Sequence, residues 1–159
     1  MQGGYLSYGL LGALAIALLV AAFTDLHRRQ IDNWLNGGIA IAAPLFWYAS
    51  GLGLADIGWQ IACALATFAV LAMLFAIRAM GGGDVKLLTA LALWIVPSAF
   101  FKLLIMMALV GGFLTIVFGA WHIARRRRDR LAVPYGIAIA AAGLWTMAVE
   151  YLPAAQPAA

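Results

Sequence analysis

The chain has 159 residues, of which 66% are hydrophobic and 10% are charged, and its formal net charge is +4. A soluble globular domain carries about 25% charged residues, so this composition excludes one. It also excludes a disordered chain, which is poor in apolar residues, and a disulfide scaffold, because Cys63 is the single cysteine. The length suits one domain over residues 1–159, which in lipid allows about six helices of about 20 residues each.

The predicted elements are six apolar segments, which we interpret as transmembrane helices. In chain order they cover residues 5–24, 34–50, 57–77, 87–101, 103–121 and 132–152. Every backbone amide in lipid must be hydrogen-bonded within the protein, which favours helices for these segments. A membrane β-barrel would alternate apolar and polar residues, whereas the first segment is apolar nearly throughout. The predicted fold is therefore all-α and polytopic, with a tight hairpin at Pro97 between the fourth and fifth helices.

The basic residues are distributed unevenly between the predicted loops. Nine of the ten Lys and Arg residues fall in the first, third and fifth loops, and Lys102 falls in the fourth. By the positive-inside rule the odd-numbered loops face the cytoplasm, so both termini face the outer, periplasmic side. We interpret the four arginines at 125–128 as a topology anchor that contacts anionic lipids. A basic stretch embedded in apolar sequence indicates membrane orientation and not nucleic-acid binding.

Two acidic residues, Asp25 and Asp84, are candidates for chemistry. Asp25 directly follows the first apolar segment, and Asp84 shortly precedes the fourth. The number of spans between them places both at the cytoplasmic side, at similar depth. Two carboxylates in a partly desolvated site can share a proton, so that one acid and one base coexist. Such a pair can activate water and protonate a leaving amine, which is the chemistry of aspartyl proteases and requires no metal or other cofactor.

The surroundings of the two aspartates allow other interpretations. Three glycines, at 81–83, precede Asp84 and let the backbone approach other groups closely. At membrane depth, non-helical backbone is tolerated only beside protein or a wet cavity, so the run suggests a site open to water. Alternatively, Asp84 is simply the cap of the fourth helix, and Asp25 is an interfacial residue paired with Arg28 or Arg29.

Two further polar residues near these aspartates have simple interpretations. We interpret Asp32 as the cap of the second helix. Lys86 either neutralises Asp84 or extends its ammonium group to the membrane interface. The sequence contains no Cys-x-x-Cys motif and no phosphate loop ending in Gly-Lys-Ser/Thr, so we expect neither a metal site nor a nucleotide cofactor.

Three segments resemble motifs of the type IV prepilin peptidases. Residues 81–87, Gly-Gly-Gly-Asp-Val-Lys-Leu, resemble the family's Gly-x-Gly-Asp-x-Lys-Leu signature. Residues 24–33 resemble its first motif, in which an aspartate is followed several residues later by Ile-Pro-Asn, and Asp32 stands where the family usually has proline. Residues 133–136, Val-Pro-Tyr-Gly, resemble a further recurring segment. In span count and motif order the resemblance covers nearly the whole chain.

The resemblance implies an intramembrane aspartyl endopeptidase in a bacterial inner membrane. Asp25 and Asp84 would then be the catalytic dyad, supported by Gly81, Gly83 and Lys86. The implied substrates are prepilins, in which a basic leader is cut from an apolar helix at the cytoplasmic membrane face. Long members carry an N-terminal methyltransferase domain, often with paired cysteines, so we expect the short, peptidase-only form of the tight-adherence (Flp) pilus systems. Prepilins and membrane lipids are the expected partners.

Two other functions are compatible with the same residues. In a small transporter or channel subunit, Asp25 and Asp84 would line a polar path, as intramembrane carboxylates often do. Transporters usually place such groups near the midplane within paired repeats, whereas here both lie at span ends and no repeat is evident. The other alternative is a catalytically inactive relative that only binds prepilins.

Overall fold

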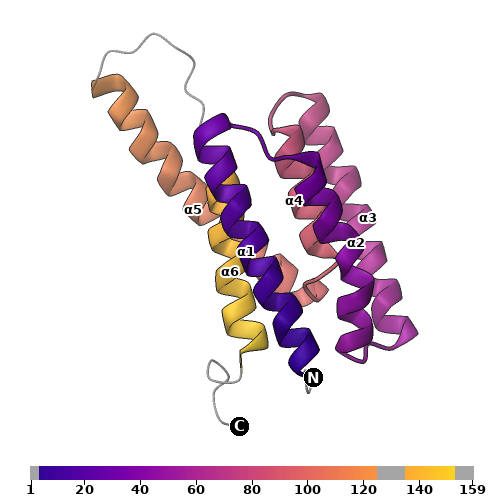
Figure 1. Cartoon of the computed structure of the whole chain (residues 1–159). Coiled ribbons are helices and arrows are strands. Elements are labelled where there is room, and N and C mark those ends of the chain that lie inside the picture. The colour runs from indigo at the N-terminus through magenta and orange to yellow at the C-terminus, as the bar shows by residue number, and fades with distance from the viewer. Residues whose placement is uncertain (1–3, 125–134, 153–159) are drawn as a thin grey trace.

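The computed structural model describes residues 4–124 and 135–152, and this part of the chain is helical with no strand (Figure 1). The all-α prediction is therefore confirmed for the described residues. The helices are α1 (Tyr5–Arg28), α2 (Asn33–Ala49), α3 (Leu54–Ala76), α4 (Gly82–Ala92), α5 (Pro97–Ala124) and α6 (Tyr135–Tyr151). The predicted arginine anchor at 125–128 lies outside the described residues.

Three of the described helices are long and apolar enough to cross a membrane. They are α1, α3 and the Pro97–Trp121 part of α5. Helices α2 and α6 have 17 residues each and α4 has 11. Large apolar side chains are exposed on the long helices, among them Ile16 on α1, Met73 on α3 and Ile116 on α5. Apolar surface of this extent on a folded chain is suited to lipid and not to water.

The stretch predicted as one helix at 87–101 is divided in the structure, so this boundary was wrong. Helix α4 ends at Ala92, and α5 begins at Pro97, before the predicted start at 103. Proline lacks an N–H and its fixed φ suits the first position of a helix, while it disfavours helical backbone in the residue before it. Between the helices the backbone forms a tighter turn, in which the Trp94 N–H donates to the carbonyl of Leu91, three residues earlier, at 2.9 Å.

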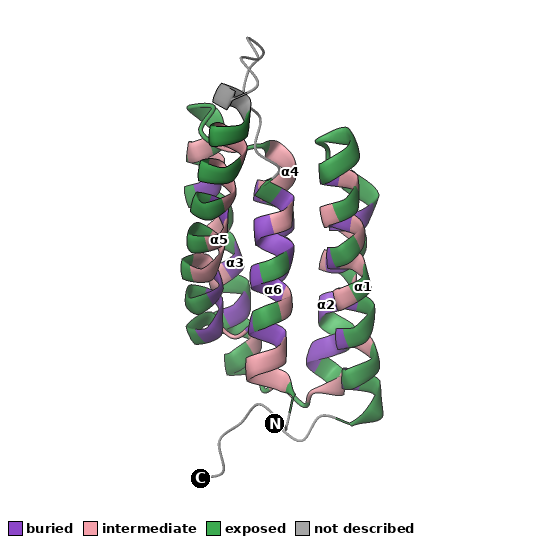
Figure 2. Ribbon diagram, turned by 90° about the vertical axis from the view of Figure 1, so that its left-hand side faces the viewer, coloured by how far each residue is buried: buried purple, intermediate pink, exposed green. Residues whose placement is uncertain are grey.

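Helix α4 lies at the centre of the bundle and packs against α2, α3 and α6. Its side chains Leu87, Leu88 and Leu91 have no exposed surface. Buried residues follow α4 and α6, whereas α3 and α5 are largely exposed (Figure 2). The start of α1 and the end of α6 lie at one end of the bundle (Figure 1). The α1–α2 and α3–α4 connections lie at the other end, and they form the candidate site.

Hydrogen bonds between α2 and α4 fix the two helices in a parallel arrangement. At their beginnings, Lys86 Nζ donates to Asn33 Oδ1 at 2.7 Å. Further along, Trp94 Nε1, just past α4, donates to the Ile39 carbonyl at 2.8 Å, and the Phe46 and Trp94 rings stack with centroids 4.9 Å apart. Because buried indole N–H groups need acceptors, these contacts specify the register. The starts of α2 and α4 are thereby held side by side.

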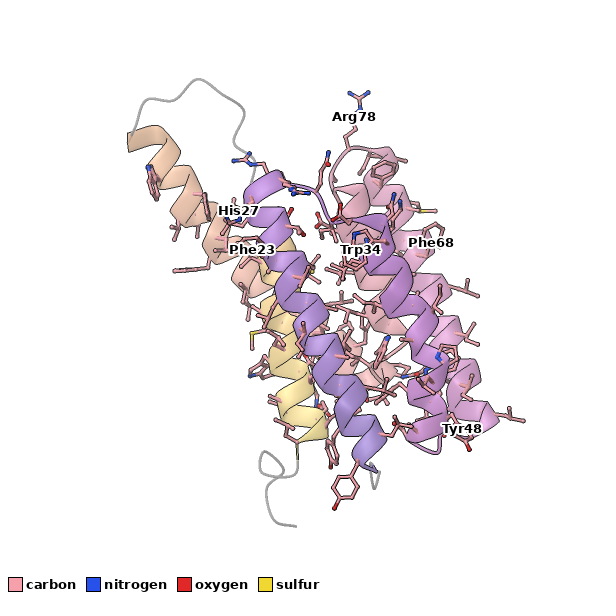
Figure 3. All side chains as sticks on the ribbon, viewed as in Figure 1. Phe23, His27, Trp34, Tyr48, Phe68 and Arg78 are labelled. Atoms are coloured by element: carbon pink, nitrogen blue, oxygen red, sulfur yellow. The ribbon has the colours of Figure 1, made fainter. Side chains whose placement is uncertain are left out.

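At this end, α1 stops at an arginine with left-handed backbone, and α3 is followed by one just past its C-cap Ile77. Arg29 has φ 53° and Arg78 has φ 61°. The Arg29 N–H donates to the Asp25 carbonyl at 2.9 Å, and the Arg78 N–H donates to the Phe75 carbonyl at the same distance. These bonds satisfy carbonyls in the last turns, a role that glycine usually fills. The Arg78 side chain projects outward from the bundle (Figure 3).

Candidate active site

Asp25 lies in the last turn of α1 and is buried, with 7% of its surface exposed. The backbone N–H of Gly136 donates to Asp25 Oδ2 at 2.8 Å. Gly136 is the second residue of α6, so the carboxylate accepts one of the N–H groups that a helix leaves free at its N-terminus. A Cβ on Gly136 would lie 2.8 Å from both Cβ and Oδ2 of Asp25. The contact therefore requires glycine at this position.

Asp84 lies in the first turn of α4, whose N-cap residue is Gly81. Its carboxylate bends back and accepts a hydrogen bond from the Gly81 N–H. Asp56 makes the same kind of contact in α3, where the Gly53 N–H donates to its Oδ2 at 3.3 Å. Asp84 thus contributes to capping, at the third helical position and not at the N-cap itself. Its surroundings distinguish it from Asp56.

Asp25 and Asp84 line the same cavity, which has a volume of about 440 Å³. The rest of its wall comes from residues 29–33, between α1 and α2, and from the glycine run at 81–83. The structure thus brings the two aspartates together at one end of the bundle, as the count of predicted spans implied. The two residues are close enough for the negative charge of Asp25 to raise the pKa of Asp84.

The carboxyl of Asp84 is harder to ionise than that of an ordinary aspartate. Asp84 lies outside the three helices that are long enough to cross a membrane. Burial raises its pKa and the negative charge of Asp25 adds to this effect, to a value of about 6, although the hydrogen bond from Gly81 opposes the shift. Desolvation and a like charge both disfavour the ionised form. Asp84 is therefore partly protonated near neutral pH.

The glycine run permits close packing around the cavity. A Cβ on Gly83 would lie 3.2 Å from Ile31 Cβ and 3.4 Å from its backbone nitrogen, and one on Gly82 would lie 3.2 Å from the Phe75 ring. A Cβ on Gly81 would lie 3.0 Å from Asp84 Oδ2. Small residues here let the α1–α2 connection approach the turn that carries Asp84.

Lys86 does not form an ion pair with Asp84. Its ammonium group donates to Asn33 instead, which ties the start of α4 to the start of α2. Asn36 makes a second, longer contact of this kind, from Nδ2 to the Gly83 carbonyl at 3.5 Å. Lys86 and Asn36 thus join α2 to the segment that presents Asp84.

Asp32 occupies the N-cap position of α2, as predicted, but its carboxylate makes no capping hydrogen bond. Asp32 instead lines the cavity that contains Asp25 and Asp84. Arg29 lines the same cavity. The cavity therefore combines three carboxyl groups with one guanidinium group.

Gly136 is the site residue that sequence reasoning did not identify. The segment 133–136 resembles a family motif, but nothing in its composition indicates that a backbone N–H reaches Asp25. A glycine at the second position of an apolar helix, in a segment that also contains Pro134, was the available signal. Residues 133 and 134 lie outside the described part of the chain.

Residues 12–120 match the type IV leader peptidase family. The match includes Asp25, the glycine run and Asp84, and it ends before α6 and Gly136. No match was found among curated proteins or among solved structures. Because the matched segment covers well over half of the sequence and contains both aspartates of the cavity, the chain belongs to the type IV leader peptidase family.

Proposed function

We propose that the protein is an aspartic endopeptidase that removes the basic leader from Flp-type prepilins. In this proposal the six apolar segments predicted from the sequence are inserted in the bacterial inner membrane with both termini in the periplasm, and cleavage occurs at the cytoplasmic face. Family membership supports peptidase activity. The observation that carries the assignment of the dyad is the cavity lined by both Asp25 and Asp84.

The surroundings of the two carboxyl groups favour different roles. The carboxylate of Asp25 accepts a hydrogen bond from the Gly136 N–H at 2.8 Å, so one of its oxygens faces a backbone donor and carries no proton there. Asp84 has a pKa of about 6 and holds a proton more readily. Asp25 is therefore the general base and Asp84 the general acid, as expected where two environments make two carboxyl groups differ.

The reaction then proceeds in two balanced steps. Asp25 takes a proton from water as the oxygen bonds to the scissile carbonyl carbon, and Asp84 gives its proton to the carbonyl oxygen. In the second step the C–N bond breaks, Asp25 gives its proton to the leaving nitrogen, and Asp84 recovers a proton as the C=O bond re-forms. The leader leaves with a new carboxyl terminus and the pilin with a new amino terminus. Both side chains end in their starting states.

The supporting residues have distinct proposed roles. Gly81 and Gly83 allow the close turn that presents Asp84, and Lys86 holds that turn against α2 through Asn33. Asp32 adds a negative charge to the cavity wall and thereby favours a basic leader. A transporter path is less well supported, because the cavity is formed where helices begin and end and not near their middles.

The test is co-expression of the chain with each prepilin encoded in the same genome. A shift of the pilin to smaller size, with sequencing of its new N-terminus, would identify both the activity and the cleaved bond. Asp84→Asn is the inactive comparison, and Asp56→Asn is the matched control because Asp56 has the same capping contact away from the cavity. Uncut prepilins in the presence of a well-folded wild-type chain would exclude the peptidase and favour a binding protein.

A further inference from the structure

A mainly apolar groove of about 370 Å³ borders the candidate active site and runs along α2. From α2 it is lined by Asn33, Asn36, Gly37 and Ala40. These positions follow the i, i+3, i+4, i+7 spacing of one helix face. Asn33 also lines the cavity that contains the two aspartates. The groove and the cavity therefore meet at this residue.

Helix α4 forms the facing wall of the groove with an equivalent pattern. Its lining residues are Lys86, Thr89, Ala90 and Leu93, which again follow the i, i+3, i+4, i+7 spacing. The two helices start together and run in the same direction, so both faces lead away from the cavity. Seven residues of helix rise about 10 Å, which is the length of about two turns. Phe68 of α3, labelled in Figure 3, contributes a third wall.

Asn36 carries an unpaired hydrogen-bond acceptor at this groove. The residue is 4% exposed, and its Nδ2 is directed to the Gly83 carbonyl. Its Oδ1 has no hydrogen-bond partner among the described residues. A buried acceptor without a partner destabilises a folded chain. Asn36 lines the groove, so this acceptor belongs to the groove wall and is not used by the described residues.

Gly37 shows that the groove is open space and not a packing contact. A Cβ built on Gly37 would meet no atom within 4 Å. Gly83 and Gly136 differ from it, since a Cβ on either would press on a neighbouring residue. Packing within the chain therefore does not require glycine at 37, and a side chain there would extend into the groove.

We propose that this groove binds the first two turns of the apolar helix that follows the scissile bond. The inference rests on the proposed peptidase function and adds how the substrate lies. The first turn of a helix has free N–H groups, and in this arrangement they would lie near Asn36, beside the cavity. A lipid acyl chain has no such donors. The basic leader would then remain in the cavity with the carboxylates.

The first test fills the groove from α2. Gly37→Leu places a side chain in it, and Gly38→Leu is the matched control, because Gly38 is equally open but does not line the groove. Both changes replace a glycine inside a helix and favour folding. We expect kcat/KM for a prepilin to fall at least about tenfold with Gly37→Leu, the equivalent of one lost apolar contact, and to change less than about twofold with Gly38→Leu. Equal activity of the two variants would overturn the proposal.

The second test measures binding without cleavage. A photoreactive benzophenone residue replaces Phe68 in the Asp84→Asn chain, and in a control it replaces Phe113, which is exposed on α5. A peptide with the leader and apolar helix of a prepilin should cross-link at 68 and not at 113. Equal cross-linking at both positions, or adducts at position 68 with lipid only, would overturn the proposal that the groove binds the substrate helix.

The two proposals fail in distinguishable ways. If the wild-type chain cuts prepilin and Gly37→Leu cuts it equally well, the proposed groove binding is wrong and the proposed peptidase activity is supported. If the wild-type chain leaves prepilin uncut while the peptide cross-links specifically at position 68, the groove is supported as a peptide-binding site and the proposed peptidase activity is wrong.

Discussion

Gly136 donates its backbone N–H to Asp25 Oδ2 across 111 residues of sequence, at 2.8 Å. This contact places the start of α6 directly against the carboxylate at the end of α1. It also means that the site depends on a helix beyond the segment that matches the family.

Gly136→Ala is expected to inactivate the enzyme without unfolding it. The new Cβ would lie 2.8 Å from Asp25 Oδ2, so the carboxylate must move. Misplacement of a reacting group by about 1 Å can cost about 100-fold in rate, and we expect a loss of that order. Gly143→Ala is the control. Gly143 is on α6, like Gly136, but away from the cavity, and a Cβ there would lie 2.9 Å from a methyl group of Leu18 on α1. Prepilin cleavage per folded molecule is the measurement, and equal losses for both variants would contradict the prediction.

Asp25→Asn and Asp84→Asn are each expected to lower prepilin cleavage by about 10²–10⁴-fold, the range for loss of a general acid or base. The amide keeps the shape of the side chain but removes its proton transfer. Because the two groups act together, the double variant should be little worse than either single one. Asp56→Asn should retain activity, since Asp56 only caps α3. Multiplicative losses in the double variant would show that the two carboxyl groups act independently.

The pH dependence of kcat/KM should report the protonation of Asp84. As the general acid, Asp84 must carry a proton in the free enzyme, and its pKa is about 6. We therefore expect kcat/KM to be higher below about pH 6 and to fall about tenfold per pH unit well above it. Asp56→Asn should leave this profile unchanged. A kcat/KM that is constant between about pH 5.5 and 8 would assign the proton to another group.

Asp32→Pro is expected to stabilise the protein and weaken leader binding. Asp32 has φ −64°, which is the value that proline imposes, and its carboxylate makes no capping bond. A gain of about 0.4–1 kcal/mol in unfolding free energy follows from the smaller entropy of the unfolded chain. The loss of one charge should raise KM for a basic leader about threefold and leave kcat unchanged.

Asp32→Asn separates the effect of charge from that of the proline ring. It should raise KM equally but give no gain in stability. The measurements are the thermal midpoint in detergent and the kinetics with leaders of different charge. A lower thermal midpoint for Asp32→Pro, or an unchanged KM for both variants, would show that Asp32 has a different role.

The pairing of Asp25 with Asp84 was predictable because it depends on a coarse property of the sequence. The number of apolar segments between the two residues determines at which end of the bundle each one lies. The structure places both on one cavity, as that count implied. By contrast, hydropathy gave the wrong extent for α4, because residues 93–96 remain apolar after the helix has ended. There, the start of α5 at Pro97 determines the boundary.

The partners of individual side chains were beyond the reach of sequence patterns. Lys86 lies two residues from Asp84 in sequence, yet it donates to Asn33, because the register of α2 against α4 decides which acceptor is near. The role of Gly136 likewise depends on how α6 meets α1. Such contacts arise from the packing of separate helices, and no local periodicity encodes them.

The left-handed arginines at the ends of α1 and α3 have a consequence for membrane insertion. A residue other than glycine in this conformation costs about 1–2 kcal/mol of backbone energy, and Arg29 and Arg78 both adopt it. In the proposed orientation these same residues supply positive charge that keeps their end of the bundle in the cytoplasm. Glycine at either position would relax the folded backbone and remove part of the signal read during biosynthesis. A variant with glycine in place of Arg29 or Arg78 would therefore have a more relaxed folded backbone and would insert less faithfully.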